Sequence, residues 1–117
     1  MKYTGTIVGF KSSLGSIYSI ISEDSKCYAW KANVVAEFIG KILRVSFNWN
    51  GDFFELKLSL LKEDYYTGKI LLAGDEFGKI YLWRYIKGNQ IILKGDFVED
   101  IAGNYDCFIE LRPFEGR

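Results

Sequence analysis

Residues 66–70 read Tyr-Thr-Gly-Lys-Ile and residues 77–81 read Phe-Gly-Lys-Ile-Tyr, and this stretch decides the fold prediction. Residues 3–7 read Tyr-Thr-Gly-Thr-Ile and residues 14–18 read Leu-Gly-Ser-Ile-Tyr at the same separation, so the two patterns align without a gap. The match predicts an internal repeat. Two hairpins of similar composition would give the same match, because glycine and β-branched residues recur in all hairpins. Both interpretations predict an all-β chain.

The length and composition favour one soluble domain. A chain of 117 residues falls in the range of a single domain, which we expect to cover residues 1–117, with the possible repeat at 3–34 and 66–97. No apolar run approaches the roughly 18 residues of a membrane span, so no membrane association is predicted. Fifteen basic and fifteen acidic residues cancel, which argues against nucleic acid as a partner.

The N-terminal residues and the cysteines point to a reducing compartment. Met1 is followed directly by strand-like sequence, with no apolar segment or cleavage site of the secretory kind. We therefore expect a cytoplasmic protein. In that compartment Cys27 and Cys107 are expected to be free, buried thiols.

Short alternating segments follow one another along the chain. Residues 43–49 alternate apolar and polar positions, and Asn50-Gly51 then provides the strongest short-range signal for a hairpin. Strands are expected at 2–10, 14–22, 26–32, 43–49, 54–60, 65–73, 77–86, 89–98 and 104–112. The prediction is an antiparallel meander of about eight or nine strands, closed into a barrel or a strongly curled sheet.

Residues 33–40 interrupt this pattern and predict one short helix. Val34, Phe38 and neighbouring apolar residues recur at helical spacing between Asn33, a possible N-cap, and Gly40, a possible stop. Such a helix would plug one end of the barrel or act as a lid over a ligand site.

The first segment also resembles a known family. Thr4-Gly5-Thr6 followed by Leu14-Gly15-Ser16 is similar to the first hairpin of avidin-like barrels, which belong with the lipocalin-like small β-barrels. The resemblance implies a barrel fold and makes Ser16 the matching candidate for a ligand-binding hydroxyl. The family has Trp directly after Thr-Gly-Thr, where this chain has Ile7, so the resemblance does not extend to biotin binding.

The inventory of reactive side chains argues against an enzyme. The chain contains no histidine, which removes the commonest general base and every His-ligated metal site. We predict no catalytic residue, no metal and no cofactor. The best remaining acid/base candidates are four carboxylates around the last hairpin: Asp96, Glu99, Asp100 and Asp106. A solvated acidic turn explains them better, because turns attract Asp and Asn for backbone reasons.

Aromatic residues provide the candidate binding sites. Tyr81, Trp83 and Tyr85 share one face of a strand, and Arg84 lies on the other. If the aromatic face points outward, it forms an exposed ladder of the residue types that dominate protein interfaces. If it points inward, it lines a barrel interior that could hold a flat or apolar ligand. Trp30 and Trp49 are further candidates.

These observations predict a non-catalytic binding protein. The first hypothesis is recognition of another protein through an aromatic-rich barrel face or edge, as in inhibitor or immunity-type factors. The alternative is binding of a small apolar ligand in the barrel interior. A carboxylate-dependent enzyme is a third, more remote hypothesis.

Overall fold

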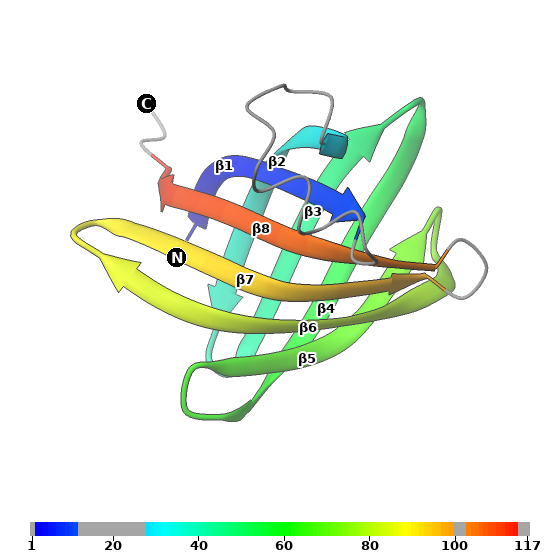
Figure 1. Cartoon of the computed structure of the whole chain (residues 1–117). Coiled ribbons are helices and arrows are strands. Elements are labelled where there is room, and N and C mark those ends of the chain that lie inside the picture. The colour runs from blue at the N-terminus through cyan, green and yellow to red at the C-terminus, as the bar shows by residue number, and fades with distance from the viewer. Residues whose placement is uncertain (1, 12–27, 100–102, 115–117) are drawn as a thin grey trace.

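The structure is a computed structural model that describes residues 2–11, 28–99 and 103–114 (Figure 1). The strands are β1 (Lys2–Lys11), β2 (Tyr28–Ile39), β3 (Ile42–Trp49), β4 (Asp52–Lys62), β5 (Tyr65–Leu72), β6 (Asp75–Lys87), β7 (Gln90–Glu99) and β8 (Gly103–Pro113). In these residues there is no helix of the length and apolarity needed to cross a membrane.

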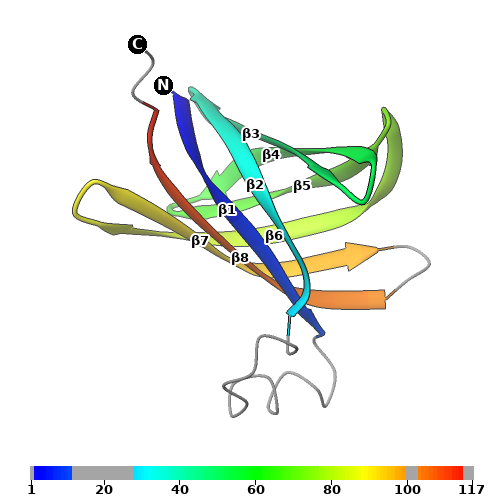
Figure 2. The same ribbon diagram turned by 90° about the horizontal axis from the view of Figure 1, so that it is seen from above.

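The eight strands close into an up-and-down barrel. Each strand pairs antiparallel with the next, and β8 pairs with β1, which therefore lies between β8 and β2 (Figure 2). Each strand therefore has a neighbour on both sides, and β2 pairs with β3 through residues 35–39 only. The predicted antiparallel barrel is confirmed. The predicted strand at 14–22 lies outside the described residues.

The predicted helix at residues 33–40 is wrong, because this segment continues strand β2. Val34 and Ala36 point into the barrel and Val35 points out, which is the two-residue period of a strand. Asn33, expected as an N-cap, pairs with Thr6 in the middle of the β1–β2 ladder. The spacing of the apolar residues is compatible with the period of a helix and with that of a strand. Pairing with β1 and β3 stabilises the strand.

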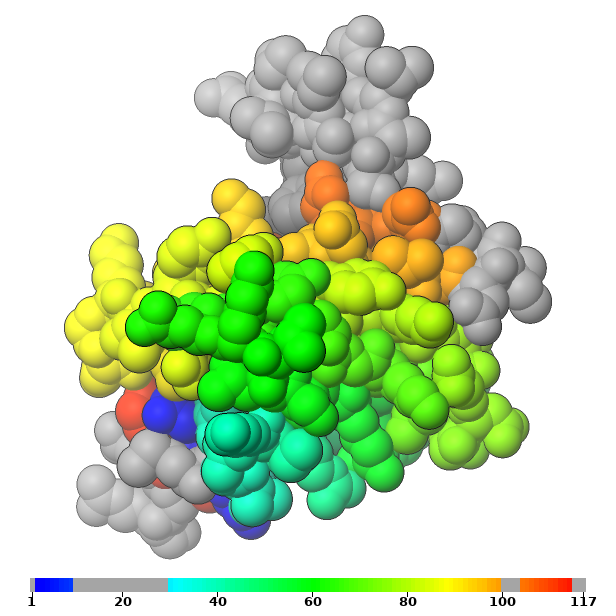
Figure 3. Space-filling model, turned by 90° about the horizontal axis from the view of Figure 1, so that it is seen from below, coloured from blue at the N-terminus to red at the C-terminus, as the bar shows by residue number. Residues whose placement is uncertain are grey.

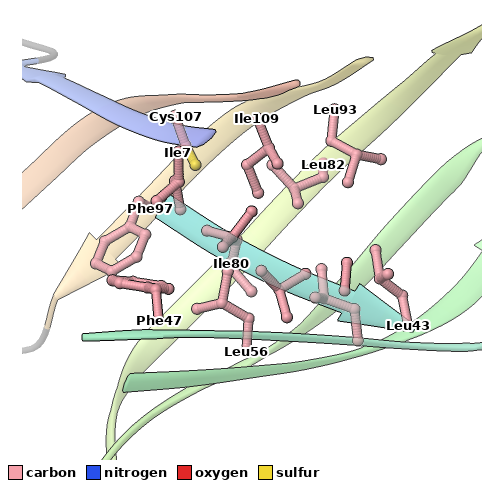
Figure 4. Close-up of a cluster of buried hydrophobic side chains, with 14 of the residues drawn as sticks. Ile7, Leu43, Phe47, Leu56, Ile80, Leu82, Leu93, Phe97, Cys107 and Ile109 are labelled. Carbon is pink, nitrogen blue, oxygen red and sulfur yellow. The ribbon is translucent and has the colours of Figure 1, made fainter. Parts of the chain in front are cut away.

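The interior of the barrel is filled by apolar side chains (Figure 4). Alternate residues of every strand point inward, as predicted for the 43–49 and 54–60 segments. The buried cluster consists of Ile7, Trp30, Val34, Ala36, Leu43, Val45, Phe47, Phe54, Leu56, Leu58, Tyr66, Ile70, Ile80, Leu82, Ile91, Leu93, Phe97, Cys107, Ile109 and Leu111. Cys107 is a free, buried thiol, and Cys27 lies outside the described residues. The fold is held by one continuous apolar core.

The turn at Asn50-Gly51 has the conformation that the sequence predicts. Both residues have positive φ, 53° and 84°, and they join Trp49 directly to Asp52 in the β3–β4 ladder. Positive φ at both central positions is what a type I′ turn requires, and Asn and Gly adopt it at low cost. This turn fixes which side chains of both strands face the core.

Two glycines of the repeated Tyr-Thr-Gly sequence allow the barrel to bend tightly. A Cβ atom on Gly5 would lie 1.7 Å from the backbone oxygen of Glu110, and one on Gly68 would lie 1.8 Å from that of Lys57. Any side chain at either position would therefore collide with a neighbouring strand. The two glycines occupy β1 and β5, half the barrel apart. The repeat itself stays a prediction, because residues 14–18 lie outside the described residues.

Candidate binding surface

Strand β6 presents three of its aromatic residues to the outside of the barrel, whereas its fourth, Phe77, packs against the core. Ile80 and Leu82 are fully buried, whereas Trp83 is 41% exposed and Tyr85 is 54% exposed. Tyr81, on the same outer face, is partly exposed. Of the two arrangements that the sequence allowed, the structure has the outward-facing one.

The side chains of Trp83 and Tyr65 pack together on this outer face. The two residues are direct cross-strand partners in the β5–β6 ladder, and their ring centroids lie 4.4 Å apart at an angle of 37°. The ammonium group of Lys62 lies 5.6 Å from the Tyr65 ring centroid and 5.4 Å from that of Trp83. We call Tyr65, Tyr81, Trp83 and Tyr85 the aromatic surface.

Arg84 points to the inner side of the same strand. Its Nε donates a hydrogen bond of 3.0 Å to Asp64 Oδ1, and its NH1 group donates one of 2.9 Å to the hydroxyl of Tyr66. Tyr66 is 1% exposed, so Arg84 supplies the partner that its buried hydroxyl needs. The guanidinium also lies 5.5 Å from the Tyr66 ring centroid. Arg84 therefore contacts the core residue Tyr66 and lies on the opposite face of β6 from the aromatic surface.

Trp30 and Trp49 lie together at the opposite end of the barrel. Trp30 is buried, with its ring stacked on Phe47 at 5.9 Å and edge-on to Phe97 at 5.0 Å. The Trp49 ring lies 6.3 Å from that of Trp30 and is 37% exposed at the rim. Trp30 therefore belongs to the core, and Trp49 lies against it at the exposed rim. Ser16, the remaining candidate, lies outside the described residues.

The barrel interior leaves little space for a ligand near these tryptophans. The gap lined by Trp30, Phe47, Trp49, Phe54, Phe97 and Glu99 has a volume of only about 10 Å³. That is about the space needed by one water molecule. Burial raises the pKa of Glu99, and burial together with the Glu99 charge raises the pKa of Tyr105. The gap is a packing defect beside an acidic side chain.

The carboxylates around the last hairpin do not form one cluster. Asp96 and Asp106 are cross-strand partners on the outer face of the barrel. Glu99, the last residue of β7, instead lines the gap beside Trp30 and Trp49 on the inner side. Burial and then the Asp96 charge raise the pKa of Asp106, while Lys94 lowers it. Asp100 lies outside the described residues. Within those residues no group of three potential metal ligands is found.

The outer face also carries a row of cationic side chains that sequence reasoning missed. The strand registers place Arg44 opposite Lys57, Lys57 opposite Lys69, and Lys69 opposite Lys79. We call these four residues, on strands β3 to β6, the cationic band. Arg44 pairs with Glu55 at 2.7 Å and Lys69 with Glu76 at 3.5 Å. Only the register between strands could have revealed the row, because these residues are far apart in sequence.

Comparison with known proteins finds no protein family, no curated protein and no solved structure that matches this chain.

Proposed function

We propose that this chain is a non-catalytic binding protein that recognises another protein through its aromatic surface. The observation that carries the proposal is the Tyr65–Trp83 ring pair on the outside of a barrel whose inside is already filled. Tyr and Trp concentrate binding energy in protein interfaces because they bury a large apolar area with few rotatable bonds. An inhibitor or immunity-type factor is the kind of protein that we expect.

The neighbourhood of the aromatic surface supports this proposal. Tyr85 lies two residues beyond Trp83 on the same outer face and is 54% exposed, so aromatic area continues toward the end of β6. Lys62 and Lys94 flank the Tyr65–Trp83 pair on strands β4 and β7. An apolar centre with a charged rim is the usual anatomy of an interface. A partner covering Trp83 would bury the rings without having to bury the lysine charges.

Ligand binding inside the barrel is the second candidate. It is favoured by one observation, the gap beside Trp49, whose partly exposed ring lies at the rim. A ligand larger than water would have to displace that ring from its contact with Trp30. The enzyme hypothesis is supported less, since Glu99 and the Asp96–Asp106 pair are on opposite faces of the sheet.

Native mass spectrometry of the protein purified from its own host tests the proposal. We expect a stoichiometric polypeptide to accompany the wild-type protein and to be lost from the Trp83→Ser variant. Ile39→Ser is the matched control, because Ile39 is also an exposed apolar side chain, 51% accessible, on the outside of β2. A co-purifying small molecule that survives Trp83→Ser and is lost with Trp49→Ser would contradict the proposal and favour the interior site.

A further inference from the structure

We infer that the partner of the aromatic surface carries a short acidic segment that lies across the cationic band, an inference that rests on the proposed function. The band and the aromatic surface share strands β5 and β6 (Figure 3 views the molecule from the side of β5). On β6, Lys79 comes two residues before Tyr81 and four before Trp83, all on the outer face. On β5, which runs antiparallel to β6, Lys69 comes four residues after Tyr65 on the same outer face.

The band combines like charges in direct opposition. Neighbouring strands are about 4.8 Å apart, and like charges placed opposite one another destabilise a sheet. The lysines of β4, β5 and β6 nevertheless face each other in succession. Within the described part of the chain no ion pair is found at Lys57 or Lys79. The two ammonium groups are exposed and available to carboxylates from outside.

The extent of the band fits a short segment of protein. Four strands span three spacings, roughly 14 Å, which is the length of about four extended residues. Glu37 ends the row at β2, and Val98 ends it at β7. Glu55 and Glu76 lie beside the band, where they pair with Arg44 and Lys69. Asp96, the cross-strand neighbour of Tyr81 on β7, faces Asp106 on β8. A long polyanion such as single-stranded nucleic acid would pass over these carboxylates, whereas a short acidic segment would not.

The chemistry of the partner follows from the order of the surfaces. Two or three carboxylates would contact the band, and an aromatic or branched apolar side chain would cover Trp83 and Tyr65. Lys79 and Trp83 are four residues apart on β6, and a strand advances about 3.4 Å per residue. The band and the ring pair are therefore about 13 Å apart. A segment with an acidic run and an apolar anchor a few residues away matches that spacing.

A displayed library of random peptides, selected on the wild-type protein, tests this inference. We expect the enriched peptides to contain Asp or Glu runs beside an aromatic residue, and to lose binding with Trp83→Ser. Lys57→Gln/Lys79→Gln should weaken these peptides about fivefold, since each exposed charge pair contributes modestly. The loss should shrink in high salt. Lys41→Gln/Arg112→Gln removes the same charge from exposed positions outside the band and should leave affinity unchanged.

Each other outcome overturns the inference. One such outcome is a set of peptides that need Trp83 but lack acidic residues. Another is a set whose affinity does not change with Lys57→Gln/Lys79→Gln. Either result would exclude an acidic partner segment but would not contradict the proposed function. Oligo-dT that binds through the same lysines, while acidic peptides do not, would make the band a nucleic-acid surface. A library without any Trp83-dependent peptide would overturn the inference alone, because host purification tests the proposed function separately.

Discussion

Trp83 packs against Tyr65 on the outer surface of the barrel, with ring centroids 4.4 Å apart, rather than against the core. Core and surface therefore make separate contributions on strand β6. Ile80 and Leu82 pack in the core, whereas Tyr81, Trp83 and Tyr85 lie on the outer face and are partly or largely exposed.

Replacing Trp83 should abolish partner binding at a small cost in stability. Trp83→Ser removes one aromatic pair, worth about 1 kcal/mol beyond area burial, from a side chain that is 41% exposed. Urea unfolding measures the free energy of unfolding, and host purification measures binding. Collapse of the fold in this variant would show that Trp83 is mainly structural.

Replacing Gly68 should damage the barrel. Gly68→Ala places a Cβ atom against the β4 backbone, and overpacking of this kind costs about 3 kcal/mol. Gly88→Ala is the control, since nothing lies near its Cβ position and only its φ of +62° costs about 1 kcal/mol. Thermal unfolding followed by circular dichroism compares them. Equal melting temperatures would mean that the strands are not so close at Gly68.

Removing a charge from the cationic band should stabilise the free protein. Lys57 lies between Arg44 and Lys69, so Lys57→Gln relieves two like-charge contacts and should raise the free energy of unfolding by about 0.5 kcal/mol at low salt. The gain should disappear in high salt. Lys87→Gln, at a turn and opposite Gln90, should change nothing. Destabilisation by Lys57→Gln would argue against repulsion along the band.

Arg84 and Tyr66 should behave as a coupled pair. Arg84→Leu leaves the buried Tyr66 hydroxyl without its partner, which should cost about 2 kcal/mol. In Arg84→Leu/Tyr66→Phe the orphaned hydroxyl is gone, so part of the loss should be recovered. A double-mutant cycle of unfolding free energies measures this coupling. Strictly additive losses would show that the hydrogen bond contributes nothing.

Glu99 should make stability fall as pH rises. Burial raises the pKa of Glu99 in the folded state, so the folded protein holds its proton at pH values where the unfolded chain has released it. Stability therefore declines from the ordinary carboxyl range up to the raised pKa, and Asp106 acts in the same direction. Glu99→Gln should be stabilising at neutral pH and should flatten the profile. An unchanged profile would contradict the burial of this group.

The sequence predicted those parts of the fold that depend on local pattern. Alternation at residues 43–49 and positive φ at Asn50-Gly51 are local properties, and both are present in the structure. Residues 33–40 were misassigned because their apolar spacing fits a helix and a strand alike, and only pairing with β1 separates the two. Long-range pairing is not encoded in any single window of sequence.

The candidate surface was predictable only in part. The aromatic residues of β6 could be identified, but which face was outside depended on the packing of Ile80 and Leu82 in the closed barrel. The cationic band depends on the register of three successive strand pairs, so residues such as Lys57 and Lys79 appeared unremarkable in sequence. The alternation in the sequence places Arg84 on the face opposite the aromatic residues, but its hydrogen bond to Tyr66 depends on the pairing of β5 with β6 and could not be predicted from local pattern.

The three tryptophans distinguish binding at the aromatic surface from binding at the opposite end of the barrel, because Trp83 lies on the first and Trp30 and Trp49 lie at the second. The protein is labelled with 5-fluorotryptophan, and its ¹⁹F NMR resonances are assigned with Trp83→Phe and Trp49→Phe and followed while the captured partner is titrated. We predict that the Trp83 resonance shifts or broadens and that those of Trp30 and Trp49, at the far end of the barrel, stay in place. A titration that moves Trp30 and Trp49 and leaves Trp83 unchanged would contradict binding through the aromatic surface.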